Sequence, residues 1–503
     1  MMGLPDPLKT LDLRWPAIGL SCLFSLLVII LNPIPNDDAF SYLRAAQLFG
    51  TEGLRATLST YGWYGYSVLI GLASQVLPGS LMTSAHILNI LAFALLVYAF
   101  VTLAMEFRAT RHVQVFAVMI ILCFPTINEM RFNLIRDFAY WGFCLTALVQ
   151  LIRYNRSGAL VHALGWVLAM AAAIFFRLEG LIILALSPFA LLAQSSIPLA
   201  QRWLKTGSLF LLVMVFTAAM LLVFLPADVN LVDIFRYAWR WYLPLLTNYP
   251  DTLANAAAGV PLALDVTTDL ALFTGKGLFI LFLGFLWSVI SNLVMALGPA
   301  LALVMGYAFL SGKHPLPAAC KWPWAAYLVC AVLALLVFVS ILQFLTTRYA
   351  VLAALLLLSV MPLYLEQLYQ QAMAQGSPRR FQVIVTVIAA YFLLDSLVSF
   401  GYSKRYIEDA IDWSQANIAA GQHVTTNNFA LAYYTGLVPE YDMIESNPSR
   451  VLQTLPEEGY VILELAHDNA VARKAAADNA ALVELVRFGN KRDDIVVIYQ
   501  LQR

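Results

Sequence analysis

Long runs of apolar residues recur through the first 400 residues of this chain and constrain its fold more than any other feature. A helix needs roughly 20 predominantly apolar residues to cross the hydrocarbon core of a bilayer. Apolar residues make up 61% of the chain and charged residues 12%, a balance outside the range of soluble domains. We therefore predict an all-α, polytopic membrane domain over residues 1–400. Its spans, about eleven by this criterion, are expected at Pro16–Leu31, Leu81–Met105, His112–Pro125, Phe138–Ile152, Leu160–Phe176, Leu181–Ala193, Gly207–Leu225, Asn292–Leu310, Trp322–Leu345, Tyr349–Leu365 and Phe381–Phe400.

The connections between these runs alternate in charge. Every second connection is basic, and Lys and Arg in short loops are retained on the cytoplasmic side of a membrane. We therefore expect a cytoplasmic amino terminus and, with an odd number of spans, outer loops at 33–80 and 226–276 and a carboxy-terminal tail outside. No small-residue cleavage site follows the first run, so we expect it to stay in place as an anchor. The basic residues are Lys9, Arg14, Arg108, Arg111, Arg153, Arg156, Arg202, Lys205, Lys313, Lys321, Arg379 and Arg380.

The loop after the first span is expected to carry a short helix on the outer membrane surface. Apolar residues recur at near-helical spacing over Asp37–Phe49, and Gly50 marks an expected stop. The aromatic cluster Tyr61–Tyr66 is typical of an interfacial belt. The next run, Ser67–Leu77, is too short to span comfortably, so we place it beside the membrane. If it spanned instead, the charge pattern of every later loop would invert.

A soluble domain is predicted over residues 401–503, because charged residues, Asn and Gln return after Phe400. Amphipathic helical patterns alternate there with short β-rich runs, which is typical of a small α/β layer. We expect helices at Arg405–Ala419 and Asn469–Val486, and strands at Val424–Thr426, Tyr460–Leu465 and Ile495–Leu501. No glycine-rich phosphate-binding turn is present, so the sequence does not support nucleotide binding in this domain.

Charge and cysteine placement exclude further classes of partner. The formal net charge is zero, which argues against nucleic acid. Four of the five cysteines fall in predicted spans, Cys320 lies two residues before one, and none lies in the carboxy-terminal tail, so neither a disulfide nor a thiolate metal site is expected. One apolar segment, Gly277–Ile290, directly precedes a predicted span, and we interpret it as a surface or re-entrant segment.

Charged residues mark the outer ends of the predicted spans. Such residues are costly beside lipid and are candidates for function by default. Each also has a plain structural interpretation. Asn36 and Asp37 could cap the surface helix, and the others could form interfacial ion pairs or anchors. The set consists of Asp37, Asp38, Arg131, Arg136, Asp137, Arg177, Glu179 and Arg348, with Tyr349 beside the last.

Carboxylates and arginines at one depth supply the groups needed to move a sugar from a lipid phosphate. A carboxylate can act as general base toward an acceptor hydroxyl or amine, and arginines bind phosphate through planar, bidentate donors. The lipid phosphate departs as an anion, so it needs charge neutralisation more than it needs a proton.

The motifs that carry these charges resemble those of the GT-C superfamily of integral-membrane glycosyltransferases. Asn36-Asp-Asp-Ala-Phe-Ser-Tyr-Leu-Arg-Ala-Ala46 is similar to the first outer loop of that family, and Arg136-Asp-Phe138 to its second-loop motif. Arg177-Leu-Glu-Gly180 resembles the Arg-x-Glu that often ends the fifth span, and Thr347-Arg-Tyr349 the Arg-Tyr that often opens a late one. The resemblance covers the predicted membrane domain and is greatest to the aminoarabinose and protein-mannosyl transferase branch.

This resemblance implies an inverting transfer from a polyprenyl-phosphate sugar, carried on undecaprenyl phosphate, to an envelope glycolipid, glycan or protein. Asp37 or Asp38 would be the base, and many members have Asp-Glu where this chain has Asp-Asp, so the choice between them stays open. Asp137 with Arg136 would orient donor or acceptor, and Arg348 would hold the carrier phosphate. The other candidate substrate-binding residues are Tyr42, Arg44, Arg131, Arg177, Glu179 and Tyr349.

No cofactor is implied by the sequence. No His or Cys cluster with metal-ligand spacing is present, which agrees with a metal-independent mechanism but leaves open a divalent cation bound by carboxylates. The resemblance places the chain in a bacterial inner membrane as a multi-pass protein with a periplasmic carboxy-terminal domain.

Two other functions compete with transfer. A secondary transporter would hold its charges near mid-membrane on broken helices related by internal symmetry, and the sequence shows neither property. A lipid-flipping or assembly protein without transferase activity is the second alternative, and in it the acid pair would be dispensable.

Overall fold

The computed structural model describes residues 11–60, 64–195, 197–224, 277–310, 316–342, 344–397 and 404–502. Among these residues, each predicted apolar run lies mostly on one helix or on two consecutive helices. The loop predicted at 226–276 lies outside the described residues, as do residues 61–63 of the aromatic cluster. The corresponding helices are α2 (Arg14–Leu31), α6 (Leu81–Phe107), α7 (Arg111–Cys123), α9 (Asp137–Ser157), α10 (Leu160–Phe176), α11 (Gly180–Leu186) with the 3-10 helix η1 (Ser187–Ala193), α12 (Leu199–Phe224), α15 (Gly277–Leu297), α16 (Pro299–Leu310), α17 (Ala318–Leu342), α18 (Thr347–Leu358), α19 (Met361–Ala374) and α20 (Pro378–Leu397).

Several of these helices are long and apolar enough to cross a membrane. By length and composition the described residues contain 4 such helices, or 6 when each of two bent pairs counts as one span. The chain is therefore a multi-pass membrane protein, and the count of about eleven spans stays a prediction.

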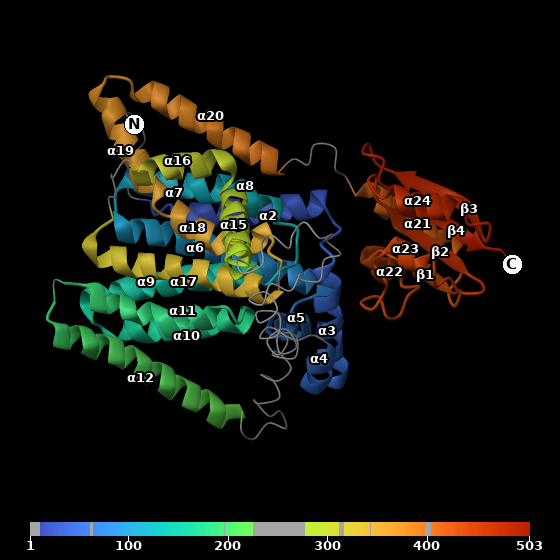
Figure 1. Cartoon of the computed structure of the whole chain (residues 1–503), viewed down its shortest axis with the longest axis horizontal. Coiled ribbons are helices and arrows are strands. Elements are labelled where there is room, and N and C mark those ends of the chain that lie inside the picture. The colour runs from blue at the N-terminus through green and yellow to red at the C-terminus, as the bar shows by residue number, and fades with distance from the viewer. Residues whose placement is uncertain are drawn as a thin grey trace.

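Helix α9 lies in the middle of the bundle and packs against α6, α10 and α17 (Figure 1). Small residues permit these close approaches. A Cβ added at Gly142 of α9 would lie only 3.0 Å from Cγ of Leu95 on α6. Because most of α9 is buried, Asp137 at its start is held in a fixed position.

The predicted span Asn292–Leu310 is wrong as a single helix. Helix α15 ends at Leu297, α16 begins at Pro299, and their axes differ by 102°. Gly298 between them has a φ of +79°, which a residue without a Cβ adopts readily, and Pro299 is favourable at a helix start. Figure 1 shows α15 crossing the bundle while α16 runs along it.

The expected surface helix is α3 (Asp38–Glu52), which packs on α5 (Gly65–Val76). It extends beyond the predicted stop and ends before Gly53, whose φ is +82°. Gly71 of α5 permits the contact, because a Cβ there would lie 2.7 Å from the ring of Phe49. A short helix, α4 (Leu54–Thr60), follows α3.

The carboxy-terminal domain contains a four-stranded sheet in the order β1-β2-β4-β3. Strands β1 and β2 are parallel, and β4 is antiparallel to both β2 and β3. The predicted helix Asn469–Val486 is wrong in its second half. Leu482 and Val486 pair with Leu501 and Ile498 of β4, so sheet pairing determines the conformation there. The elements are α21 (Arg405–Asn417), β1 (Val424–Thr426), α22 (Phe429–Thr435), α23 (Pro448–Val451), β2 (Tyr460–Leu465), α24 (Ala470–Ala477), β3 (Leu482–Gly489) and β4 (Ile495–Leu501).

This domain docks on α3 through aromatic and polar contacts. The ring of Phe40, on α3, lies 5.4 Å from the ring of Tyr433, on α22. Arg44 pairs with Asp442 at 3.6 Å. The carboxy-terminal domain and α3 therefore lie at the same end of the bundle, as Figure 1 also shows.

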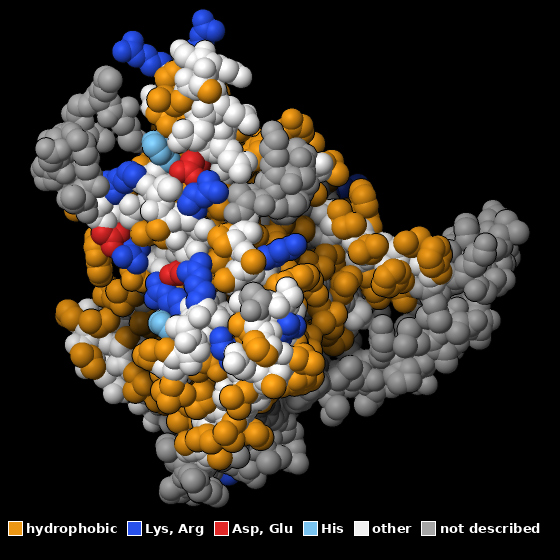
Figure 2. All heavy atoms as spheres, turned by 90° about the vertical axis from the view of Figure 1, so that its left-hand side faces the viewer, with side chains coloured by type: hydrophobic (Ala, Val, Ile, Leu, Met, Phe, Trp, Pro, Cys, Tyr) orange, Lys and Arg blue, Asp and Glu red, His pale blue; other side chains and the backbone are white. Residues whose placement is uncertain are grey.

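The opposite end of the bundle is basic. Figure 2 shows Lys and Arg side chains gathered on this face among apolar ones. Arg153 and Arg156, near the end of α9, share Glu106 at 2.7 and 2.6 Å. Asp137 begins α9 and Arg156 lies in its last turn, so about 30 Å separates the two ends. The basic end is the one predicted to face the cytoplasm, and that orientation stays a prediction.

Candidate active site

Five charged residues from four separate segments form one ion network. Arg348 Nη1 donates to Asp38 Oδ2 at 2.8 Å, and Arg348 Nε lies 3.9 Å from Asp137 Oδ2. Arg177 binds Oδ1 of Asp137 and, through Nη2, Glu179 at 2.5 Å. Residues that the sequence could only place at one membrane depth are thus in direct contact.

Most of the charged residues of the network lie at helix ends, where the helix dipole favours or opposes their charge. Asp38 and Asp137 lie in the first turns of α3 and α9, where the helix dipole favours a negative charge. Arg177 immediately follows the last residue of α10, and the helix dipole favours a cation at that end. Arg348 lies in the first turn of α18, where the dipole opposes it, so its carboxylate partners must hold it there.

Burial decreases along the network from one side to the other. The side chains of Asp137 and Arg177 are 2% and 5% exposed, whereas those of Arg348 and Asp38 are 26% and 46% exposed. Buried charges are tolerated only when paired and hydrogen-bonded. The inner pair is therefore fixed, and the outer pair is accessible to a ligand.

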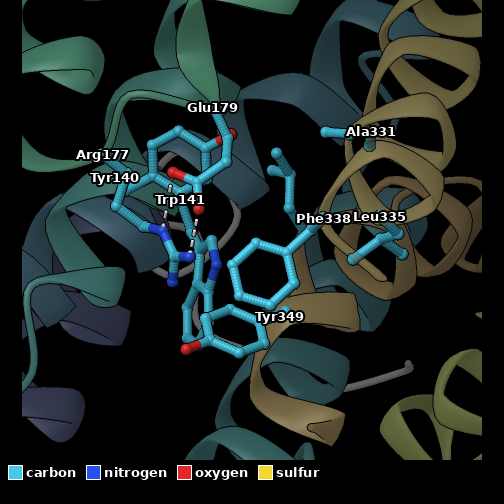
Figure 3. A pocket seen from close by; sticks show the side chains of 10 residues that line it. Tyr140, Trp141, Arg177, Glu179, Ala331, Leu335, Phe338 and Tyr349 are labelled. Carbon is cyan, nitrogen blue, oxygen red and sulfur yellow. Dashed lines mark hydrogen bonds and ion pairs between the residues drawn. The ribbon is translucent and has the colours of Figure 1, made fainter. Parts of the chain in front are cut away.

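A pocket with about 380 Å³ of empty space, part of it open to solvent, adjoins the inner end of this network. Figure 3 shows Arg177, Glu179 and Tyr140 on one side and residues of α17 on the other. Tyr349 connects the two sides, because its ring lies 4.5 Å from the Arg177 guanidinium carbon and 4.4 Å from the Phe338 ring. The pocket therefore has a charged end and an apolar wall. Its lining residues are Tyr140, Trp141, Arg177, Glu179, Ala331, Ala334, Leu335, Phe338, Tyr349 and Leu352.

The two adjacent acids, Asp37 and Asp38, have different surroundings. Asp38 is bound to Arg348. Asp37 is still accessible to solvent, yet partial burial raises its pKa, Lys404 lowers it, and Glu464 and Asp38 raise it further. Lys404 and Glu464 belong to the carboxy-terminal domain, so Asp37 lies where that domain meets the membrane domain.

Arg131 does not join the network, although we predicted it as a substrate-binding residue. Its side chain is 1% exposed and donates to Ser21, Ser25 and Asn128 over 2.7 to 3.1 Å. Its guanidinium carbon lies 4.3 Å from the centre of the Phe93 ring. These contacts connect the segment before α9 to α2 and α6, so the structure gives Arg131 a structural position.

Three other candidate residues lie beside the network. Tyr42 is buried with its ring edge-to-face with Tyr66, at 5.2 Å. Arg44 faces the carboxy-terminal domain, and Arg136 is half-buried beside Glu179. The alternative interpretation, in which Asn36 and Asp37 cap α3, does not hold in the described structure. Asp37 makes no side-chain cap, and the Asn36 side chain accepts instead from the Leu134 N–H at 2.9 Å.

Sequence reasoning missed the apolar wall of the pocket and the contribution of the carboxy-terminal domain. Leu335 and Phe338 look like any lipid-facing residues of a span, and nothing in the sequence pairs Lys404 or Glu464 with Asp37. Within the described ranges, no group of three or more His, Cys, Asp and Glu side chains is arranged to hold a metal ion.

Comparison with known proteins identifies the fold. No protein-family model and no curated protein matches the chain. The oligosaccharyltransferase of Archaeoglobus fulgidus, in its complex with Zn and sulfate, is similar with a TM-score of 0.50 and 14% identity, over 96% of this chain and 72% of that one. At this identity the likeness bears on fold and not on activity.

Two further solved structures are similar at lower scores. ArnT from Cupriavidus metallidurans, bound to undecaprenyl phosphate, has a TM-score of 0.43 and 12% identity, over 97% of this chain and 98% of that one. The Archaeoglobus fulgidus oligosaccharyltransferase tethered with an acceptor peptide has a TM-score of 0.45 and 13% identity, over 86% of this chain, which spans 60% of that protein's length. The chain therefore shares the fold of the Archaeoglobus fulgidus oligosaccharyltransferase.

Proposed function

We propose that this protein transfers a sugar from a polyprenyl-phosphate donor to an acceptor in the bacterial cell envelope. The observation that carries the proposal is the ion network of Asp38, Arg348, Asp137, Arg177 and Glu179 beside a pocket with an apolar wall. A lipid phosphate has both features that this site complements, an anionic head and an apolar chain.

The donor phosphate is assigned to Arg348. This guanidinium is the more exposed of the two in the network, and among the described residues it donates a hydrogen bond through Nη1 alone. Arg177 is enclosed between two carboxylates and serves to hold Asp137 and Glu179 in place. The α17 wall formed by Leu335 and Phe338 would contact the start of the lipid chain.

Asp37 is assigned as the general base. A base must be free to accept a proton, and within the described part of the chain Asp37 forms no ion pair closer than 4 Å, whereas Asp38 is bound to Arg348. Partial burial raises the pKa of Asp37, and a carboxylate with a raised pKa is a stronger base. Asp38 then acts by positioning Arg348.

The proposed reaction is a single displacement. Asp37 takes the proton of an acceptor hydroxyl or amine, and the acceptor atom bonds to the anomeric carbon from the side opposite the phosphate. The bond between that carbon and the phosphate oxygen breaks, and the lipid phosphate leaves as an anion stabilised by Arg348. Attack from the opposite side inverts the anomeric centre. The acceptor is an envelope glycolipid, glycan or protein.

Release of the carrier lipid tests this proposal. The full chain in nanodiscs is incubated with polyprenyl-phosphate sugars and acceptors extracted from the native envelope, and free polyprenyl phosphate is measured by mass spectrometry. We expect release by the wild-type chain and none by Asp37→Asn. A transporter or lipid-flipping protein would move the donor lipid without cleaving it, so intact donor throughout would overturn the proposal.

A further inference from the structure

One guanidinium joins two carboxylates that come from distant parts of the chain. Arg348 contacts Asp38 at 2.8 Å through Nη1 and approaches Asp137 to 3.9 Å through Nε. Asp38 begins α3 and Asp137 begins α9. Arg348 is therefore the contact that connects the surface helix to the bundle at this site.

Two carboxylates in such a place require a cation. The side chain of Asp137 is 2% exposed, and a second negative charge nearby, with little water to screen it, is unfavourable. Proteins commonly solve this problem with a divalent ion, whose oxygen ligands are carboxylates and water. Here the network has three carboxylates and two guanidiniums, so removing Arg348 would leave three negative charges against one positive charge.

The oxygens that a divalent ion would use are already engaged. Asp38 Oδ2 accepts from Arg348, Asp137 Oδ1 is bound by Arg177, and Asp137 Oδ2 faces Arg348 Nε. A metal ion placed between Asp38 and Asp137 would have to displace the guanidinium first. Among the described residues no third His, Cys, Asp or Glu side chain is arranged with these two as a ligand, so water would have to complete the coordination of an ion at this place.

We propose that Arg348 is the resident cation of this site and occupies the place between Asp38 and Asp137 that a divalent ion would otherwise take. The inference rests on the proposed function only in treating the network as the active site. It makes Arg348 a positioning residue for both acids, in addition to its assigned contact with the donor phosphate. It also means that the wild-type site has no need of a metal ion to balance its carboxylates.

Binding of Mn²⁺ alone tests this inference without any assay of transfer. The full chain is placed in phosphatidylcholine nanodiscs, and free Mn²⁺ is followed by electron paramagnetic resonance during titration. We expect no site on the wild-type chain that depends on Asp38. In Arg348→Ala, and in the bulkier Arg348→Met, we expect a new site at least about tenfold tighter than any background binding. In these variants Asp38 loses its partner, and Oδ2 of Asp137 no longer faces a guanidinium.

Three control variants make the result specific. Arg348→Lys keeps the positive charge and should not create the site. Adding Asp38→Asn to Arg348→Ala should abolish it. Arg487→Ala frees one exposed carboxylate, Glu484, from a surface pair, and should leave Mn²⁺ binding unchanged.

Either of two results would overturn the inference: an Asp38-dependent Mn²⁺ site in the wild-type chain, or no gain in both Arg348→Ala and Arg348→Met when each is shown to be folded by its thermal transition. Failure of the proposed function is a separate outcome. A chain that releases no polyprenyl phosphate but shows the expected Mn²⁺ pattern would still have Arg348 as its resident cation.

Discussion

Arg348 donates a hydrogen bond of 2.8 Å to Asp38, a residue 310 positions earlier in the sequence. This contact brings the start of α18 to the start of α3, and Asp38 is the immediate neighbour of the proposed base. The assignment of separate roles to the two adjacent acids follows from it, because Asp38 is engaged and Asp37 is not.

Replacing Asp37 or Asp38 by Asn should affect the kinetics of transfer in different ways. Asp37→Asn removes the base and should lower kcat by roughly 10²–10⁴-fold with little change in the donor KM. Asp38→Asn weakens the hold on Arg348 and should raise the donor KM more than it lowers kcat. Steady-state kinetics with purified variants would separate them, with the exposed Asp412→Asn as a control. Equal loss of kcat in Asp37→Asn and Asp38→Asn would remove the distinction.

The pH dependence of transfer should report on the raised pKa of Asp37. Burial raises this pKa above the ordinary aspartate value. As the pH falls, Asp37 therefore becomes protonated and stops acting as a base at a higher pH than an exposed aspartate would. Lys404→Gln removes a charge that lowers the pKa, and should move the acid limb of kcat to higher pH. Glu464→Gln removes a charge that raises it, and should move the limb to lower pH. Shifts in the opposite directions would contradict the assignment of Asp37.

Donor binding should depend on Arg348 and much less on Arg131. Loss of a hydrogen bond to a charged group costs about 1.5–3 kcal/mol. We therefore expect Arg348→Ala to bind undecaprenyl phosphate about 10- to 100-fold more weakly, as measured by native mass spectrometry in nanodiscs. Unchanged affinity would argue against the phosphate contact.

Arg131→Ala should instead lower stability. The substitution removes the hydrogen bonds to Ser21, Ser25 and Asn128 and leaves a cavity beside Phe93. We expect a loss of about 2–4 kcal/mol in unfolding free energy, seen as a lower thermal transition, with the affinity for undecaprenyl phosphate retained. A stable variant that no longer binds the lipid would return Arg131 to the substrate site.

Docking of the carboxy-terminal domain should depend on aromatic packing more than on its ion pair. Phe40 is fully buried between α3 and α22, so Phe40→Ala should cost about 3–5 kcal/mol. The Arg44–Asp442 pair is 3.6 Å long and Arg44 is partly exposed, so Arg44→Ala should cost no more than about 1 kcal/mol. Protease cleavage between the domains would measure docking, and equal sensitivity of the two variants would contradict this ranking.

Much of this molecule could be predicted from local patterns. Apolar runs specify helices because a bilayer leaves few alternatives for the backbone, and five of the predicted charges do meet in one network. The break at Gly298 was readable in principle, since Gly followed by Pro ends one helix and starts another. The turn at Asn479 within the predicted helix Asn469–Val486 could not be predicted from local sequence. It leads into strand β3, which forms because it pairs with β4.

The remaining features depend on contacts between distant segments. Arg131 and Arg348 both lie near outer ends of predicted spans, so the sequence does not distinguish them. In the fold, Arg131 is buried beside two serines, whereas Arg348 lies between two carboxylates. Likewise, the choice of Asp37 over Asp38 depends on Arg348 and on the carboxy-terminal domain, neither of which local sequence could place beside them.

Mass spectrometry of envelope glycolipids, glycans and proteins from a strain lacking this chain would test the central claim most directly. We predict that one sugar modification disappears in the deletion strain, returns with the wild-type chain, and does not return with Asp37→Asn expressed and inserted at the same level. An unchanged set of envelope modifications on deletion, or full restoration by Asp37→Asn, would contradict the account.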